Sequence, residues 1–364
     1  MESKKNSVLI VNYYGNAPSN PGGRRTLFWT DLFTQFGYTV DVSSFRFNEG
    51  VNVKSFFSRL ITRALGFFKE YPAGNYKWLQ EVHELIRSGK YEKIVICVPI
   101  YEVCELLAEK NNYSEYIVDI RDGIFFETLF TPLEKIKFSK RLKYFESLLK
   151  NADVITSNIP GLQCHYSKMT GKNVFLLLNS SNNSLYIKNK NKYDKLNILY
   201  AGGLMRSSWG QNIYQFLLGV KKLINIGIEC DITIIGRLNF IEKIFYKFIF
   251  SNINVIDEIP LSKLENSLMQ YNCMLLVNTT KRDLLPSKIW LYTRTEHPII
   301  SIGGSYSLLT VMEGVPGFFN VDNDSNKIFD LLSNLNLDDK YNRLSLNFDD
   351  DMSLFKSNIL NEKL

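Results

Sequence analysis

The residues best suited to binding chemistry lie in one short stretch, Pro286-Ser287-Lys288, between a predicted strand and an aromatic run. Proline is favoured in the first turn of a helix, because its missing N–H costs nothing there. Ser287 and Lys288 would then lie at the amino end of that helix. Exposed N–H groups and the positive end of the helix dipole attract anions, and Lys288 adds a full charge. The stretch predicts a phosphate site, although a surface helix with one solvated lysine fits the same residues.

A second group of charged residues ends an apolar run, Tyr116 to Asp122, that reads as a buried strand. Functional groups of open α/β sheets gather at the carboxyl ends of the strands. Asp119, Arg121 and Asp122 are therefore placed where chemistry would occur. The alternative is that an aspartate and an arginine of this group form a structural ion pair.

A third candidate is the turn-rich segment 16–25, which contains Gly22, Gly23 and Arg24 and separates an expected strand at 7–13 from an expected helix at 26–36. With the next strand at 39–42, this is the pattern of a βαβ unit. The dinucleotide fingerprint Gly-x-Gly-x-x-Gly is absent. The glycine pair indicates either close approach of a ligand to the backbone or simply a tight turn.

The second half of the chain repeats the alternation of strands and helices. Gly203 and Arg206 follow an expected strand at 196–201, and Arg237 follows another at 230–236. The fold class is therefore α/β, with two Rossmann-like, doubly wound domains facing a cleft. The expected units are a first domain (1–180), a polar Asn- and Lys-rich linker (181–195), a second domain (196–345) and a final helix (346–364) that packs back on the first domain.

Composition narrows the functional classes. With 364 residues and a net charge of +6, the chain suits two soluble domains that bind anions, and the charge is too weak to indicate nucleic acid. The five cysteines show no metal-ligand spacing and read as reduced thiols. No signal peptide is visible, and no apolar run reaches the ~18 residues of a membrane span. These features predict a cytoplasmic protein.

The block Pro-Ser-Lys-Ile-Trp-x-Tyr, followed by Pro-Ile-Ile at 298–300, resembles a motif of bacterial GT-B glycosyltransferases, similar to family 4, that build surface polysaccharides. The glycine pair near the amino terminus and the strand ending in Asp119-x-Arg121-Asp122 are similar to two further motifs of these enzymes. Leu291 stands where they often carry a ribose-binding glutamate, and Glu296-His297 replaces the usual Gly-x.

The resemblance implies transfer of a sugar from a nucleotide-diphospho-sugar to a glycan or polyprenyl-linked acceptor, in a retaining reaction without metal or cofactor, for capsule, O-antigen or exopolysaccharide synthesis. Asp122 would be the catalytic contact near the reacting sugar or the acceptor hydroxyl. The implied donor-binding residues are Gly203, Arg206, Arg237, Ser287 and Lys288. The implied acceptor-side residues are Gly22, Gly23, Arg24 and Arg121.

Two other functions fit the same fold. A sugar-nucleotide 2-epimerase would need acid–base groups, and the chain has three histidines, His83, His165 and His297. A non-catalytic partner subunit would explain the altered diphosphate and ribose motifs. The phenylalanine-rich, basic segment 51–69 predicts either peripheral contact with an anionic membrane or a core-facing helix.

Overall fold

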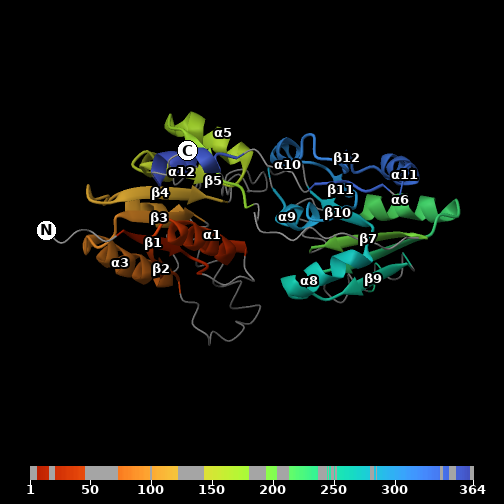
Figure 1. The fold of residues 1–364 in the computed structure, drawn as a ribbon, viewed down its shortest axis with the longest axis horizontal. Coiled ribbons are helices and arrows are strands. Elements are labelled where there is room, and N and C mark those ends of the chain that lie inside the picture. The colour runs from red at the N-terminus through yellow and green to blue at the C-terminus, as the bar shows by residue number, and fades with distance from the viewer. Residues whose placement is uncertain are drawn as a thin grey trace.

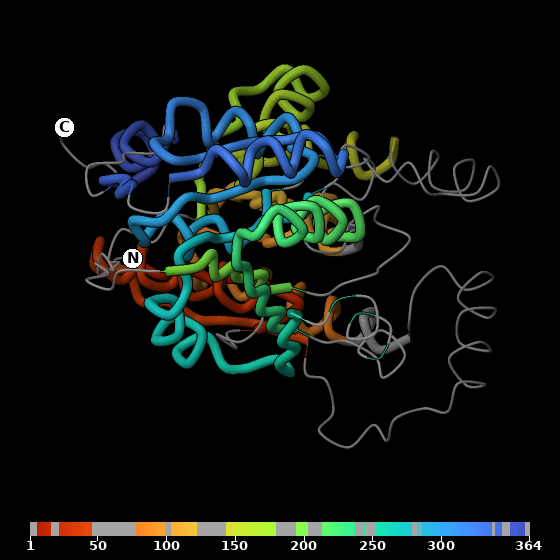
Figure 2. The backbone as a smooth tube through the Cα atoms, turned by 90° about the vertical axis from the view of Figure 1, so that its right-hand side faces the viewer, coloured from red at the N-terminus to blue at the C-terminus, as the bar shows by residue number. Residues whose placement is uncertain are grey.

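The computed structural model describes residues 6–15, 21–45, 73–98, 101–121, 143–179, 194–202, 213–236, 244, 246, 250, 252–278, 283, 285–336, 339–343 and 350–360. Within these residues, two six-stranded sheets form two lobes, which lie side by side in Figure 1. Helices cover both faces of each sheet (Figures 1 and 2). This is the three-layer arrangement expected of alternating strands and helices.

The amino-terminal lobe contains a parallel sheet with the order β2-β1-β3-β4-β5-β6. Its strands are β1 (Ser7–Asn12), β2 (Thr39–Ser43), β3 (Lys93–Val98), β4 (Glu115–Ile120), β5 (Val154–Ser157) and β6 (Val174–Leu176). Its helices are α1 (Pro21–Gln35), α3 (Ala73–Arg87), the 3₁₀ helix η1 (Tyr101–Leu107) and α5 (Pro160–Thr170). The order reverses between β1 and β3.

The carboxyl-terminal lobe contains a second parallel sheet, with the order β12-β11-β10-β7-β8-β9. Its strands are β7 (Leu196–Ala201), β8 (Cys230–Ile235), β9 (Ile253–Ile256), β10 (Cys273–Val277), β11 (Ile299–Ile302) and β12 (Phe318–Val321). Its helices are α6 (Tyr214–Asn225), α8 (Leu261–Ser267) with η4 (Leu268–Gln270), α9 (Ile289–Tyr292), α10 (Tyr306–Val311) and α11 (Ser325–Ser333). Here the order reverses between β7 and β10.

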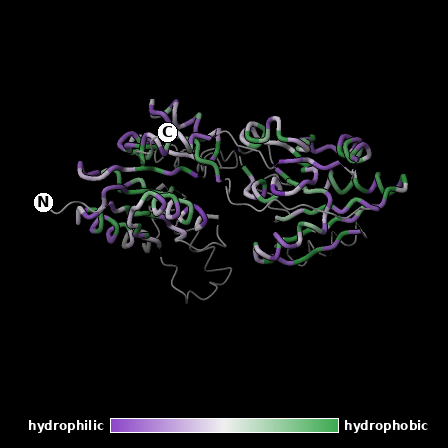
Figure 3. The backbone as a smooth tube through the Cα atoms, in the orientation of Figure 1, coloured by the Kyte–Doolittle hydropathy of each residue, from purple (hydrophilic) through white to green (hydrophobic). Residues whose placement is uncertain are grey.

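The central strands of each sheet are buried on both faces, which explains why they are largely apolar, whereas the edge strands β2, β9 and β12 are partly exposed. In β1, Leu9 and Val11 belong to one core cluster, while Val8 and Ile10 belong to the cluster on the opposite face. The carboxyl-terminal sheet likewise separates two clusters. Figure 3 shows that hydrophobic residues recur along the strands of both lobes.

The last helix, α12 (Met352–Ile359), lies against the amino-terminal lobe rather than the lobe that precedes it in sequence (Figure 1). Its buried Phe355 packs edge-on against Trp29 and Phe175, each with ring centroids 5.6 Å away. Asp351 accepts the backbone N–H of Leu176 at 2.6 Å. The chain therefore crosses from one lobe to the other a second time near its end.

Two helices of the structure, α5 and α10, were not predicted from the sequence. The pattern at 286–292 predicts a helix beginning at Pro286, whereas α9 is a single turn that begins at Ile289. After this turn the hydroxyl groups of Thr293 and Thr295 donate to the carbonyls of Ile289 and Tyr292, at 3.0 and 2.9 Å.

Candidate functional site at the lobe interface

Lys288 lies on the side of the carboxyl-terminal sheet where a ligand is expected. It follows β10 along the chain, and the strand order reverses between β10 and β7. Ligands of open parallel sheets bind at the carboxyl ends of strands at such a reversal. The Lys288 carbonyl accepts the N–H of Tyr292 at 3.0 Å, so the lysine begins the single turn of α9. Ser287 beside it is exposed.

The half-buried Lys288 side chain lies near a second cation, which belongs to the other lobe. Burial is the main cause that lowers the Lys288 pKa. Repulsion by the Arg24 guanidinium lowers this pKa further, while the Glu258 carboxylate opposes the shift. An anion between two such cations would gain charge-assisted hydrogen bonds from both. Arg24 and Lys288 therefore form the two sides of a candidate anion site.

The first turn of α1 contains Gly22, Gly23 and Arg24, and this corrects the prediction that they belong to a loop. The helix begins at Pro21 and not at Thr26. Proline suits the first helical position. The glycine pair, which suggests a turn in the sequence, therefore lies inside the first turn of the helix.

Asn12, at the end of β1, holds the beginning of α1 against the sheet. Its buried side-chain amide donates to the Gly22 carbonyl at 3.0 Å and to the Thr26 hydroxyl at 2.6 Å. A Cβ on Gly22 would lie 2.1 Å from the Tyr14 ring, so this glycine is required by close packing. Sequence analysis missed Asn12, whose only signal is a polar residue that ends an apolar strand.

Arg25, next to Arg24, is buried and forms a bidentate ion pair with Asp119 of β4. The Arg25 Nε and Nη2 atoms each lie 2.8 Å from an Asp119 oxygen. Trp29 Nε1 donates to the same carboxylate at 3.0 Å, and the Thr156 hydroxyl donates at 2.9 Å. Burial alone would raise the Asp119 pKa, but the charge and hydrogen bonds of Arg25 outweigh burial and hold this pKa below its usual value.

Asp119 does form a structural ion pair, but its partner is Arg25 of α1 and lies outside the group at 119–122 considered from the sequence. Arg121, just after β4, is also buried, and its charge contributes to lowering the Asp119 pKa. Asp122 lies outside the described residues. Its assignment as the catalytic residue stays a prediction.

A direct contact joins the two lobes and involves Asp283, which precedes Lys288 by five residues in the sequence. The backbone N–H of Gly161, in α5, donates to the Ser307 hydroxyl of α10 at 2.9 Å. Ser307 in turn donates its N–H and its hydroxyl to the Asp283 carboxylate, at 2.7 and 2.6 Å. A Cβ on Gly161 would lie 1.7 Å from an Asp283 oxygen. Sequence analysis passed over Asp283, which the tertiary structure brings to the interface.

Tyr292 connects the turn that bears Lys288 to the end of β7. Its buried hydroxyl oxygen accepts the N–H of Ala201 at 3.0 Å. The predicted donor-binding residues Gly203 and Arg206 follow Ala201 and Gly202 in the sequence. Tyr292 therefore supports the strand end that precedes them.

We expect Tyr292→Phe to lower the free energy of unfolding by about 1–3 kcal/mol, because it leaves the buried Ala201 N–H without an acceptor. Urea unfolding followed by circular dichroism measures the change. Tyr306→Phe is the matched control, because the Tyr306 side chain is 63% exposed. Equal stability of the two variants would contradict a supporting role for the Tyr292 hydroxyl.

Three of the predicted donor-binding residues, Gly203, Arg206 and Arg237, lie outside the described residues, as does the segment 51–69. Among the residues that are described, no three His, Cys, Asp or Glu side chains are grouped so that they could hold a metal ion. In the same part of the chain, no helix is both long and apolar enough to span a bilayer.

No protein-family model matches the chain, and no curated protein matches it significantly. Solved structures do match. Sucrose-phosphate synthase from Thermosynechococcus elongatus has 11% identity and a TM-score of 0.62, over 90% of this chain and 89% of that one. HepE from Anabaena, in complex with UDP-glucose, has 12% identity and a TM-score of 0.58, over 90% and 88%.

A putative UDP-N-acetylglucosamine 2-epimerase from Listeria monocytogenes is also similar, with 9% identity and a TM-score of 0.55 over 93% of both chains. Such low identities show a shared fold and nothing more. The predicted fold class is confirmed: the chain has two Rossmann-like domains in the GT-B arrangement.

Proposed function

We propose that this protein is a glycosyltransferase that moves a sugar from a nucleotide-diphospho-sugar to a glycan or lipid-linked acceptor. The observation that carries the proposal is that the charge of Arg24, from the amino-terminal lobe, acts on the half-buried Lys288 of the other lobe. In such a transfer the leaving group is a nucleoside diphosphate, whose negative charge grows as the glycosidic bond breaks. Cations held in place before the reaction stabilise that charge without reorganisation.

The proposed donor-binding residues are Ser287 and Lys288, together with Gly203, Arg206 and Arg237. Gly22, Gly23, Arg24 and Arg121 belong to the proposed acceptor side, and Arg24 also faces the diphosphate. Asp122, beside Arg121, is the proposed catalytic contact. With cations to neutralise the diphosphate, the reaction proceeds without metal, and we infer that it is retaining. HepE, which shares the fold, binds UDP-glucose, which supports a nucleotide-sugar donor.

We also propose a cellular role for the protein. The resemblance at 286–300 favours synthesis of a bacterial surface polysaccharide on the cytoplasmic side of the membrane. The segment 51–69 would then supply peripheral contact with anionic lipid, through the four basic residues Lys54, Arg59, Arg63 and Lys69.

A panel of nucleoside diphosphates, titrated by calorimetry, tests the proposal first. We expect one nucleotide to bind the wild type and to bind weakly to the Arg24→Ala and Lys288→Ala variants. The matching nucleotide sugars are then incubated with the enzyme, with and without glycan acceptors, and the products are separated by chromatography. Sugar transfer to an acceptor supports the proposal. Absence of binding by every nucleotide would overturn it.

A 2-epimerase is the second candidate, because the Listeria neighbour has the same fold. Two of the three histidines give it little support. His297 precedes β11 and so lies at the amino ends of the strands, whereas Lys288 follows the carboxyl end of β10. The His297 pKa is lowered to about 4, mainly by burial. His83 lies on α3, 3.7 Å from Glu109. An epimerised nucleotide sugar formed without acceptor would identify this activity, whereas binding without any turnover would identify a non-catalytic subunit.

A further inference from the structure

A basic hollow of about 400 Å³ lies in the amino-terminal lobe. It is at the amino ends of the strands, which are the ends opposite to the lobe interface. Its walls come from the segments that precede three neighbouring strands: 107–112 before β4, 150–153 before β5 and Lys172 before β6. The candidate anion site lies instead at the carboxyl ends of strands. The hollow is therefore a separate feature, which the proposed sugar transfer does not use.

Three lysines and one aspartate are the charged residues that line the hollow: Lys110, Lys150, Lys172 and Asp153. The single carboxylate is already occupied on both oxygens. One Asp153 oxygen accepts the N–H of Tyr116 at 2.8 Å, and the other forms an ion pair with Lys110. Asp153 therefore balances Lys110 and leaves the other two lysines in excess.

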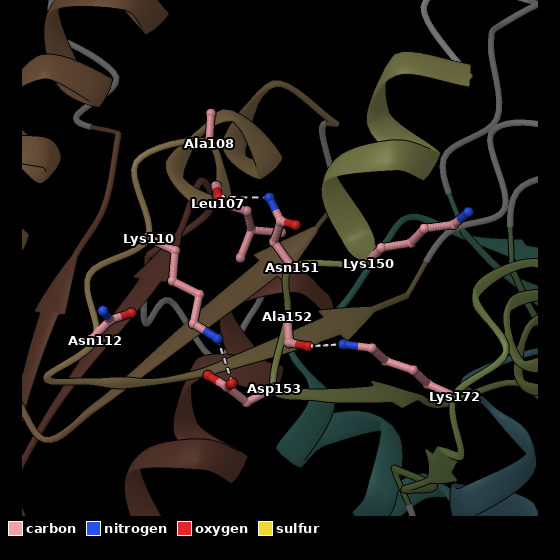
Figure 4. A pocket seen from close by; sticks show the side chains of 9 residues that line it. All are labelled: Leu107, Ala108, Lys110, Asn112, Lys150, Asn151, Ala152, Asp153 and Lys172. Carbon is pink, nitrogen blue, oxygen red and sulfur yellow. Dashed lines mark hydrogen bonds and ion pairs between the residues drawn. The ribbon is translucent and has the colours of Figure 1, made fainter.

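Lys172 has a neutral partner, because its ammonium group donates to the Ala152 carbonyl (Figure 4). Burial, as the main cause, and the nearby Lys110 charge lower the Lys172 pKa, while Asp153 opposes the shift. Lys150 lies at the rim of the hollow and is exposed, and its side chain points away from Lys110 and Lys172 (Figure 4). The Asn112 side chain also lines the hollow and adds an uncharged hydrogen-bond donor.

From this arrangement we propose that the hollow binds a phosphate group, held by Lys172 with Lys110 and Asn112 beside it, and by Lys150 once its exposed side chain turns toward the anion. A phosphate offers several acceptor oxygens to lysine ammonium groups, and charge-assisted hydrogen bonds of this kind are the strong ones. A bound anion would offset both the burial of Lys172 and its repulsion by Lys110. The phosphate could belong to a soluble compound or to a lipid headgroup.

The test uses the full chain with Arg24→Ala and Lys288→Ala, so that the lobe interface does not compete for the probe. Inorganic phosphate and diphosphate are titrated by calorimetry. Vesicles of phosphatidylcholine with and without phosphatidic acid are tested by sedimentation. We expect Lys150→Gln with Lys172→Gln to weaken binding of the probe at least about tenfold. Lys263→Gln, an exposed lysine of α8 in the other lobe, is the control that should change nothing.

Lys150→Gln alone keeps the test valid if the double variant is unstable, because Lys150 is exposed. A second measurement is the NMR titration of the lysine ammonium groups, in which phosphate should raise the Lys172 pKa. Binding of the soluble anions supports a soluble ligand, and binding to phosphatidic acid vesicles alone supports a lipid headgroup. No binding of either probe, or binding that both lysine variants leave unchanged, would overturn the proposal.

Discussion

Replacing Arg25 with leucine is expected to lower the free energy of unfolding by about 3–5 kcal/mol, because it leaves the buried Asp119 carboxylate without its cation. Asp119 and Arg25 side chains are both fully buried. Leucine fills part of the same space, so the loss comes mainly from the charge and not from a cavity. Urea unfolding followed by tryptophan fluorescence reports on this change, since Trp29 donates to Asp119 at 3.0 Å.

The pH dependence separates this explanation from simple packing loss. In the wild type the Asp119 pKa is lowered in the folded state, so its stabilising contribution is present at neutral pH and is lost as the pH falls through that pKa. In Arg25→Leu the Arg121 charge remains, but burial without the direct ion pair raises the folded pKa of Asp119, so acidification should partly restore stability. Adding Asp119→Leu should also restore stability at neutral pH. A single variant as stable as the wild type would contradict the argument.

Lys288→Met is expected to weaken binding of the nucleoside diphosphate by about 1.5–3 kcal/mol, the range for a hydrogen bond to a charged group. Methionine keeps an unbranched apolar chain in the half-buried position, so the charge is the main change. Calorimetry with the nucleotide identified in the binding panel measures the effect. Lys263→Met, on the exposed face of α8, is the control in the same lobe.

Two further measurements test whether Lys288 and Arg24 act on one anion. Their double-variant cycle should show coupling, because both cations would contact the same diphosphate. The affinity of the wild type for the nucleotide should fall as the pH rises through the Lys288 pKa. Because burial lowers that pKa, the fall should begin at a lower pH than the titration of an exposed lysine. The variant should lack this dependence. Additive losses would instead indicate that the two cations serve separate ligands.

The sequence alone predicted the elements whose pattern is local. The apolar runs at 7–13, 93–99 and 273–278 read as strands, and the structure has β1, β3 and β10 there, each ending one residue earlier. Burial on both faces of a parallel sheet makes every position of a strand apolar, so a short window carries the signal. The alternation of strands and helices then predicted the two-domain class. The beginning of α9 was predicted three residues too early, since proline favours the first turn of a helix but also suits the turn that precedes α9.

Only the tertiary structure decided the roles of neighbouring charged residues. Arg24 and Arg25 are adjacent in α1, and successive helical residues point about 100° apart, so one arginine pairs with Asp119 inside the lobe while the other faces Lys288. The sequence placed Arg24 in a loop, where this periodicity does not apply. Which face of α1 is buried depends on the sheet beneath it, and that sheet is assembled from distant strands.

Sheet topology explains two arrangements of charge. One is Arg24 with Lys288, and the other is the set of three lysines that line the hollow. Each depends on where sheet topology brings the ends of strands that are far apart along the chain, and no local pattern encodes such a meeting. Apolar periodicity records only whether a residue is buried. The position of a charge relative to other charges follows from strand order and from the contact of the two lobes, which the folded chain alone determines.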